Sequence, residues 1–209
     1  MPAARAYRAR QRTSRSEQTR ERILAAVREL LSEGSFHESA VEQVAERAGV
    51  SRATLYQHFR SRLDLVDGIC DSLAANPALQ KLRRAVELPD PEAALVETIA
   101  LSIRFWSTED PVLGPLYGVE AIDPAARDLV ERQRTDRRGE LRRLARHLHT
   151  SDRLRAGVGE RRAADLLMVL TSYETFRELR LAGLGDRQVR RTLQESARTL
   201  LLGETAQRA

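Results

Sequence analysis

Hydrophobic residues recur every three or four positions along most of this chain, the spacing that places them on one face of an α-helix. No run of alternating β-branched residues appears, so the pattern predicts an all-α protein. Pro111, Pro115 and Pro124 are expected to break the stretch 110–124 into short irregular pieces. Elsewhere we expect helices over residues 17–31, 41–48, 52–58, 61–75, 78–88, 124–149, 160–181 and 186–202, and one from Pro91 to the first of these breaks.

The stretch from Ser39 to Arg62 carries the sharpest local signals. A short apolar stripe ends at Gly49, which can take the left-handed backbone that closes a helix, and Ser51 follows as a natural N-cap for the next one. Stop and start signals this close force the two helices to cross sharply, as in a helix-turn-helix. At about 100° per residue, the second helix turns Leu55 and Phe59 inward.

The outward face of this second helix is small, polar, aromatic or cationic, which suits a surface entering a DNA major groove. An ordinary helical hairpin with a polar face is the alternative, because the same spacing occurs in bundles that bind nothing. The outward set consists of Arg52, Ala53, Thr54, Tyr56, Gln57 and His58.

Charge is divided unequally along the chain. Residues 1–62 hold 12 Arg against 7 Glu, a balance of +5, whereas residues 63–209 hold 23 basic and 23 acidic groups. Within residues 1–16, five arginines meet no acid. We expect this stretch to be a basic disordered arm, of the kind that phosphate attraction would use and that could also reach into a minor groove.

These patterns divide the chain into the arm (1–16), a helix-turn-helix domain termed the head (17–62), and a larger helical body (63–209). In the body, the segment 160–181 is apolar around most of its circumference, and 186–202 adds a further apolar stripe. This is more apolar surface than one small domain needs. It indicates a homodimer built through the two C-terminal helices.

Several classes of function are not expected. An arginine-rich start without an apolar core differs from a signal peptide, and no apolar run approaches membrane-spanning length, so we expect a cytoplasmic protein with no membrane partner. The chain contains no HExxH or CxxC motif and no glycine-rich loop after a strand. We therefore expect no catalytic residues, no metal site, no cofactor and no enzyme activity. The single cysteine, Cys70, excludes an internal disulfide.

The segment VAERAGVSRATLYQHFRSRLDLV, residues 44–66, resembles the tetracycline-repressor (TetR) family of dimeric transcriptional regulators. The resemblance implies that Tyr56 bonds a phosphate of DNA and that His58 lies against the backbone nearby. Arg62 stands where the family usually has lysine, and a guanidinium still offers charge and donors to a phosphate. Arg52, Ala53, Thr54 and Gln57 hold the positions from which the family reads base edges.

One position departs from the family pattern. The second helix of the family usually begins with a threonine that contacts a phosphate, but this chain has Ala40 and Val41 there. Ser39 is then the remaining hydroxyl donor and could serve as the N-cap. Ser51, the cap of the next helix, completes the set of expected DNA contacts.

The resemblance also implies a ligand cavity in the body, although the candidate side chains are those that any helical core contains. It implies a homodimeric repressor that leaves a palindromic double-stranded DNA operator when a small-molecule effector binds the body. A helical protein-interaction adaptor without ligand control is the alternative. The candidate ligand contacts are Phe105, Trp106, Leu113, Tyr117, Met168 and Tyr173.

Overall fold

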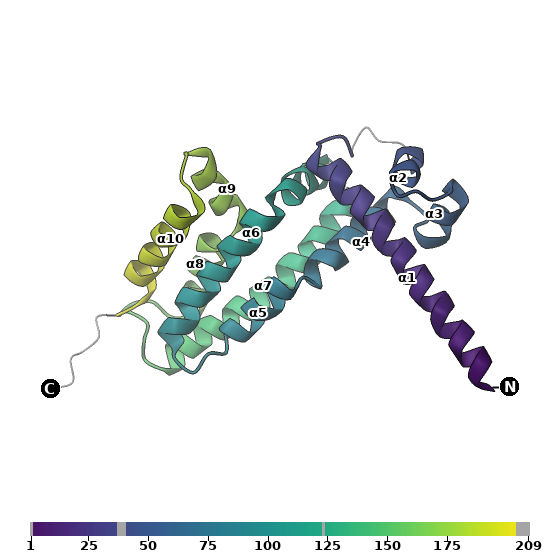
Figure 1. The fold of residues 1–209 in the computed structure, drawn as a ribbon. Helices are drawn as coiled ribbons and strands as arrows, with labels where there is room; N and C mark the ends of the chain where they lie inside the picture. Colours follow the sequence, from purple (N-terminus) through teal and green to yellow (C-terminus); the bar gives the residue numbers. More distant parts are fainter. Residues whose placement is uncertain (1, 37–40, 123, 204–209) are drawn as a thin grey trace. The chain divides into compact units, whose positions relative to one another are not determined.

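The computed structural model describes residues 2–36, 41–122 and 124–203, of which 2–13, 119–122 and 133 are described by their backbone alone. Helices account for the regular structure of these ranges, with one isolated β-bridge between Leu154 and Leu202 (Figure 1), so the all-α prediction is confirmed. The helices are α1 (Pro2–Ser32), α2 (Val41–Arg47), α3 (Arg52–His58), α4 (Arg62–Ala74), α5 (Pro77–Ala85), α6 (Pro91–Ile122), α7 (Pro124–Thr150), α8 (Glu160–Leu170), α9 (Tyr173–Leu181) and α10 (Asp186–Leu201).

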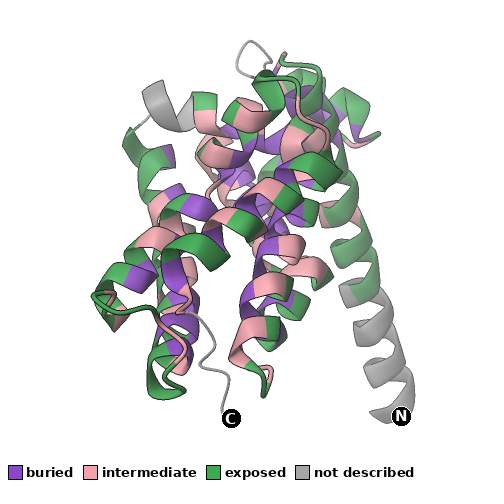
Figure 2. Ribbon diagram, turned by 90° about the vertical axis from the view of Figure 1, so that its left-hand side faces the viewer, coloured by how far each residue is buried: buried purple, intermediate pink, exposed green. Residues whose placement is uncertain are grey.

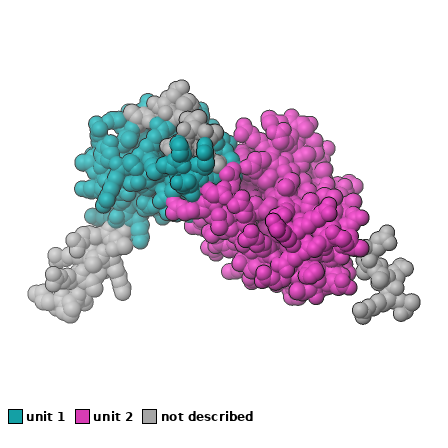
Figure 3. All heavy atoms as spheres, turned by 180° about the vertical axis from the view of Figure 1, so that it is seen from behind, with its two compact units in different colours: residues 1–73, 111–130 teal, residues 74–110, 131–209 magenta. Residues whose placement is uncertain are grey.

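The chain forms two compact units (Figure 3). Unit 1 comprises residues 1–73 and 111–130, and unit 2 comprises residues 74–110 and 131–209. Buried residues line the inner sides of the helices, and exposed residues line the outer sides (Figure 2). None of the helices in the described ranges is long and apolar enough to cross a membrane.

The first helix is longer than expected. It begins at Pro2 instead of Glu17, so the predicted disordered arm has helical backbone. Proline suits the first helical position, where its missing N–H is not needed. Alanine and arginine favour helix, and no glycine or further proline follows before Ser32. Intrinsic propensity therefore explains the difference.

The prediction that prolines break the chain after residue 109 is wrong for the first two of them. Helix α6 continues through both Pro111 and Pro115. A proline inside a helix lowers stability by about 3 kcal/mol. Next to these two prolines in the sequence, however, Val112, Leu113 and Leu116 are all buried. Burying each such side chain is worth about 1.5 to 3 kcal/mol. Packing within unit 1 thus offsets the lost backbone hydrogen bonds.

The segment 160–181 forms two helices, α8 and α9, where one was predicted. Ser172 separates them, because its Oγ accepts a hydrogen bond from the N–H of Thr175 at 3.0 Å and caps α9. The hydroxyl of Thr171 donates to the carbonyl of Leu167 at 2.7 Å, and the carbonyl of Thr171 accepts from the indole N–H of Trp106 at 2.9 Å. Side-chain bonds to the backbone therefore end one helix and begin the next.

Helix α10 closes unit 2 and follows its prediction closely. Its apolar stripe is buried, and a side-chain bond from Gln194 Nε2 to the carbonyl of Val96 at 2.9 Å ties it to α6. Arg198 reaches Glu92 of α6 at 3.4 Å. The buried stripe of α10 consists of Val189, Leu193, Ala197 and Leu201.

Candidate nucleic-acid interface

The turn between α2 and α3 is built by Gly49 and Val50. Gly49 has φ of +62°, in the left-handed region that strains a residue with a side chain. Its N–H donates to the carbonyl of Glu46, and the N–H of Val50 donates to the carbonyl of Ala45, both at 3.0 Å. These paired bonds form a Schellman ending. The predicted end of α2 at Gly49 is therefore confirmed.

Ser51 caps α3 as predicted. Its backbone is extended, and its Oγ accepts a hydrogen bond from the N–H of Thr54 at 3.1 Å. The same Oγ lies 2.8 Å from the hydroxyl of Thr54. This contact fixes the side chain of Thr54, one of the expected base readers, before any DNA is present.

Helix α3 has a buried face and an exposed face. Leu55 and Phe59 are each 1% exposed, and both pack into the core of unit 1. Tyr56 is 38% exposed, whereas the other large aromatic side chains of the described residues are buried or half-buried. The structure thus brings the predicted outward residues together on one helix: Ser51, Arg52, Ala53, Tyr56 and Gln57 are exposed, while Thr54 and His58 are half-buried.

Arg52 has neighbours that sequence reasoning missed. Its guanidinium lies 2.5 Å from a carboxylate oxygen of Glu42 on α2, and 5.5 Å from the centre of the Tyr56 ring. A hydrogen bond with Tyr56 and the charge of Glu42 raise the pKa of Arg52 above its usual value. The guanidinium stays charged, but it must exchange Glu42 for a base if it is to read DNA.

The guanidinium of Arg62 makes contacts within the protein that were not expected of a residue that binds a phosphate. Its guanidinium donates a hydrogen bond to the carbonyl of Phe36 and stacks over the ring of Phe36, 4.5 Å from the ring centre. The side chain is half-buried. Arg62 therefore ties α4 to the loop after α1, and its phosphate contact stays a prediction.

The start of α4 is fixed by a reciprocal cap. Ser61 Oγ accepts the N–H of Asp64 at 3.1 Å, and the carboxylate of Asp64 accepts the N–H of Arg60 at 2.8 Å. The bond from Arg60 is the main reason that the pKa of Asp64 is lowered. This stabilisation is present above the ordinary pKa of an aspartate and is lost as the pH falls through the lowered value.

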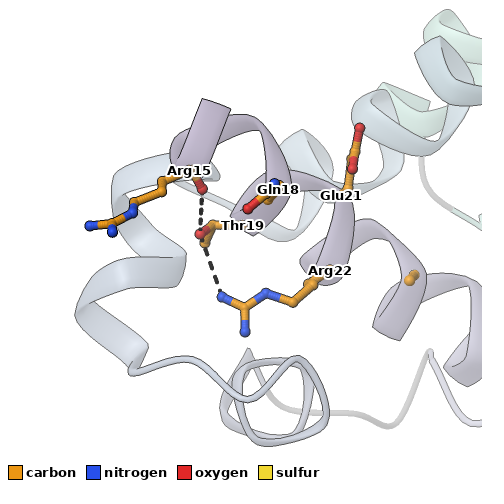
Figure 4. A pocket seen from close by; sticks show the side chains of 6 residues that line it. Arg15, Gln18, Thr19, Glu21 and Arg22 are labelled. Carbon is orange, nitrogen blue, oxygen red and sulfur yellow. Dashed lines mark hydrogen bonds between the residues drawn. The ribbon is translucent and has the colours of Figure 1, made fainter. Parts of the chain in front are cut away.

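A shallow hollow on α1 carries two further cationic groups (Figure 4). The hydroxyl of Thr19 donates to the carbonyl of Arg15 at 2.9 Å, and Arg22 Nη2 lies 3.5 Å from the Thr19 hydroxyl. Gln18 and Glu21 also line this surface. Arg15 belongs to the basic arm and Arg22 lies beyond it; both are exposed, so positive charge continues along the same helix.

One predicted contact, Ser39, lies outside the described residues, as does Ala40. A carboxylate pair anchors the end of α2 instead, because Arg47 lies 2.5 Å from Glu33 and 3.9 Å from Glu29 of α1. The pKa of Arg47 is raised, chiefly by its hydrogen bond to Glu33. The last turn of α2 is thus held on the end of α1 and the turn after it.

The six candidate ligand contacts fall in both units. In unit 2, the rings of Phe105, Trp106 and Tyr173 form an edge-to-face series with centres 5.0 and 5.8 Å apart, and Tyr173 donates to Asp110 at 2.6 Å. These three are buried, and Met168 of the same unit is half-buried. The remaining two belong to unit 1, where Leu113 is buried and Tyr117 is half-buried.

Comparison with known proteins points to one family. Residues 23–69 match the model of bacterial regulatory proteins of the tetR family. The HTH-type transcriptional activator FasR of Mycolicibacterium smegmatis is 34% identical over 84 residues, which cover 34% of this chain and 38% of FasR. The chain thus matches well under two thirds of that relative.

Solved structures share the fold over a longer range. NalD, described as the secondary repressor of the MexAB-OprM multidrug efflux pump in Pseudomonas aeruginosa, superposes with a TM-score of 0.71 at 22% identity, over 91% of this chain and 99% of NalD. A SmeT–triclosan complex superposes with a TM-score of 0.69 at 18% identity, over 90% of this chain and 93% of SmeT. SmeT is the repressor of the SmeDEF efflux pump of Stenotrophomonas maltophilia. Residues 23–69 therefore match the tetR family of bacterial regulatory proteins, and the chain shares the fold of these solved structures.

Proposed function

We propose that this chain is a homodimeric, ligand-responsive transcriptional regulator that binds double-stranded DNA through α3. The observation that carries the proposal is the exposed face of α3, held in place by the Gly49 turn, the Ser51 cap and the buried Leu55 and Phe59. A helix presented in this way, with polar side chains pointing outward, fits a major groove. The excess of positive charge within residues 1–62 supplies attraction to phosphates.

The proposed contacts divide into two groups. Tyr56 and His58 hold the phosphate backbone, Arg62 adds a contact, and Ser39 and Ser51 contribute hydroxyl groups near the helix ends. Arg52, Thr54 and Gln57 read base edges, with Ala53 leaving room for close approach. Arginine prefers guanine and glutamine prefers adenine in bidentate pairs.

The basic arm and the cations of α1 are proposed to strengthen binding without choosing a sequence. The five arginines within residues 1–16 lie on α1, which carries Arg22 further along. Such charges attract phosphates over long range and make binding depend strongly on salt. If the arm enters a minor groove, binding should prefer DNA with A·T-rich flanks. If the arm contacts only the phosphates, no such preference is expected.

Removing the carboxylate of Glu42 is expected to tighten binding to random DNA. In Glu42→Gln, the guanidinium of Arg52 loses its 2.5 Å partner and is free to turn to DNA. Because the pair is exposed, the gain should be modest, roughly threefold. Glu46→Gln is the matched control, because Glu46 is exposed on the same helix and its substitution removes the same charge. Fluorescence anisotropy at fixed salt measures both, and equal gains in the two variants would contradict a restraining role for Glu42.

Control by an effector is proposed for the body. SmeT is described in complex with triclosan, and NalD is described as a repressor. By analogy, a small molecule held by Phe105, Trp106, Met168 and Tyr173 would release DNA, and Leu113 and Tyr117 are the further candidates. The ligand must favour a state in which the two recognition helices no longer match successive major grooves. Losing a hundredfold in operator binding requires about 2.7 kcal/mol of coupling.

Dimerisation is proposed through α8, α9 and α10. Val169 and Leu181 are 62% and 72% exposed, and Leu200 is 40% exposed, so each of these helices presents a large apolar side chain to solvent. A contiguous patch of exposed apolar side chains is typical of association surfaces, and these three residues are the proposed members of one. A twofold dimer would place two heads on the two halves of a palindrome.

An adaptor that binds only proteins is the alternative function. It would leave the exposed Tyr56 and the basic arm without a role. FasR is described as an activator and NalD as a repressor, so both directions of control occur among the similar proteins. We propose repression because release on ligand binding needs only the loss of DNA contact.

Two variants test the proposed division of contacts. Tyr56→Phe removes one hydroxyl donor to a phosphate and should weaken binding to operator and random DNA alike, by roughly tenfold for each head. Gln57→Ala removes a base contact and should mainly relax the preference at one base pair, by about 1 to 3 kcal/mol. The operator is first selected from a random duplex pool, and both variants are titrated at the same salt. Equal loss of preference in the two variants would contradict the division.

A further inference from the structure

A groove in unit 2 lies between α6 and α10. Its volume is about 450 Å³, within the range of small-molecule sites. Ala100, Leu101 and Ile103 of α6 give it an apolar floor, with Ile103 only 2% exposed. Its cationic rim consists of Arg104 of α6 and Arg187 and Arg190 of α10, all exposed. The groove therefore combines apolar contact area with concentrated positive charge.

The three guanidinium groups of this rim are unpaired. No carboxylate of the described residues lies within 4.0 Å of any of them, although two nearby arginines have acidic partners. Arg191, next along α10, lies 2.8 Å from Glu195, and Arg180 lies 3.2 Å from Asp186. Three unpaired cations around one groove attract an anion, although water and salt screen them because all three are exposed.

The acids and hydroxyls of the groove do not neutralise this charge. Asp186 is already held by Arg180 and by a hydrogen bond from the hydroxyl of Ser107. The hydroxyl of Thr108 donates to the carbonyl of Arg104 at 2.9 Å. Glu97 is the remaining acid of the lining, against three arginines. The hydrogen-bond donors that the groove offers to a ligand are thus the N–H groups of its three guanidinium groups, which recognise the oxygen acceptors of an anion.

We propose that the α6–α10 groove binds a small organic anion, with a carboxylate or phosphate head group and a compact apolar part. Arg187 and Arg190 are three residues apart on α10, so they face the same side and can hold the head group together with Arg104. The apolar part rests on the floor of Ala100, Leu101 and Ile103. This site goes beyond the proposed function, because it uses neither α3 nor the candidate effector contacts.

The test is isothermal titration of the full-length protein with four probes: phenyl phosphate, benzoate, inorganic phosphate and benzyl alcohol. We expect one site per chain for at least one of the two ring-bearing anions, and at least roughly tenfold weaker binding of both inorganic phosphate and benzyl alcohol. Tighter binding of phenyl phosphate would identify a phosphate ligand, and tighter binding of benzoate would identify a carboxylate ligand. No binding by either anion, or equal binding of benzyl alcohol or inorganic phosphate, would overturn the proposal.

Variants locate the site. The double variant Arg187→Gln/Arg190→Gln should weaken binding of the tighter anion by roughly tenfold or more, since charge-assisted hydrogen bonds are lost. Arg191→Gln is the control for lost charge on the same helix, because it removes one positive charge at a residue paired with Glu195 outside the groove. Circular dichroism verifies that both variants fold. An equal loss in Arg191→Gln, or no loss in the double variant, would show that the groove is not the site.

Discussion

Replacing Phe59 with alanine is expected to lower the free energy of unfolding of unit 1 by about 3 to 5 kcal/mol. The side chain is 1% exposed, and its N–H closes α3 by donating to the carbonyl of Leu55 at 2.9 Å. Its ring is tightly packed, because a Cβ added to Gly68 would come within 2.8 Å of it. Arg20 also lies over the ring, 4.5 Å from its centre. A loss of this size is a large part of the stability of a typical domain.

Hydrogen exchange measures this effect separately in each unit, which matters because a two-unit chain need not unfold in one step. In Phe59→Ala, amides of α2 and α3 should exchange much faster, and binding to DNA should fall with them. Phe105→Ala is the matched control, since Phe105 is 3% exposed and belongs to unit 2. It should accelerate exchange in unit 2 and spare α3. Unchanged exchange of α3 in Phe59→Ala would contradict the proposed support of the reading helix.

Replacing Leu181 with aspartate, together with Val169, is expected to convert the dimer to a monomer and to lower operator affinity more than a hundredfold. These side chains are 72% and 62% exposed in the single chain, so the variant should fold normally. In a dimer that covers them, each buried carboxylate would cost several kcal/mol. A monomer also loses the second head, so its affinity for a palindrome falls towards that of one half-site.

Sedimentation velocity gives the oligomeric state, and anisotropy gives the operator affinity. Ala93→Asp is the control for added negative charge, because Ala93 is exposed in α6, outside the three proposed interface helices. It should leave both the mass and the affinity unchanged. A Val169→Asp/Leu181→Asp protein that stays dimeric would show that dimerisation uses another surface.

The helix-turn-helix could be predicted from the sequence because its signals are local. Gly49 and Ser51 stand two residues apart, and each forms its bonds within the same turn or the next. The periodicity of Leu55 and Phe59 then decides which face is buried. Such features need no knowledge of the rest of the chain.

The errors arose where distant contacts decide the outcome. Packing around Val112 and Leu116 allows α6 to pass through two prolines, although each proline alone predicts a break. Arg62 binds the carbonyl of Phe36, which is 26 residues away in sequence, so no local pattern could place it. The cap at Ser172 was present as a local signal, but the surrounding apolar run obscured it.

Salt dependence of DNA binding by the full-length protein tests the central claim most directly. Anisotropy titrations compare an operator selected from a random pool with a scrambled duplex at several salt concentrations. We expect the selected sequence to be an inverted repeat that binds at least roughly a thousandfold more tightly than the scrambled duplex. For both duplexes, the logarithm of the binding constant should fall linearly with the logarithm of the salt concentration. Equal affinity for the two duplexes, or binding without a salt slope, would contradict the assignment of α3 as a DNA reader.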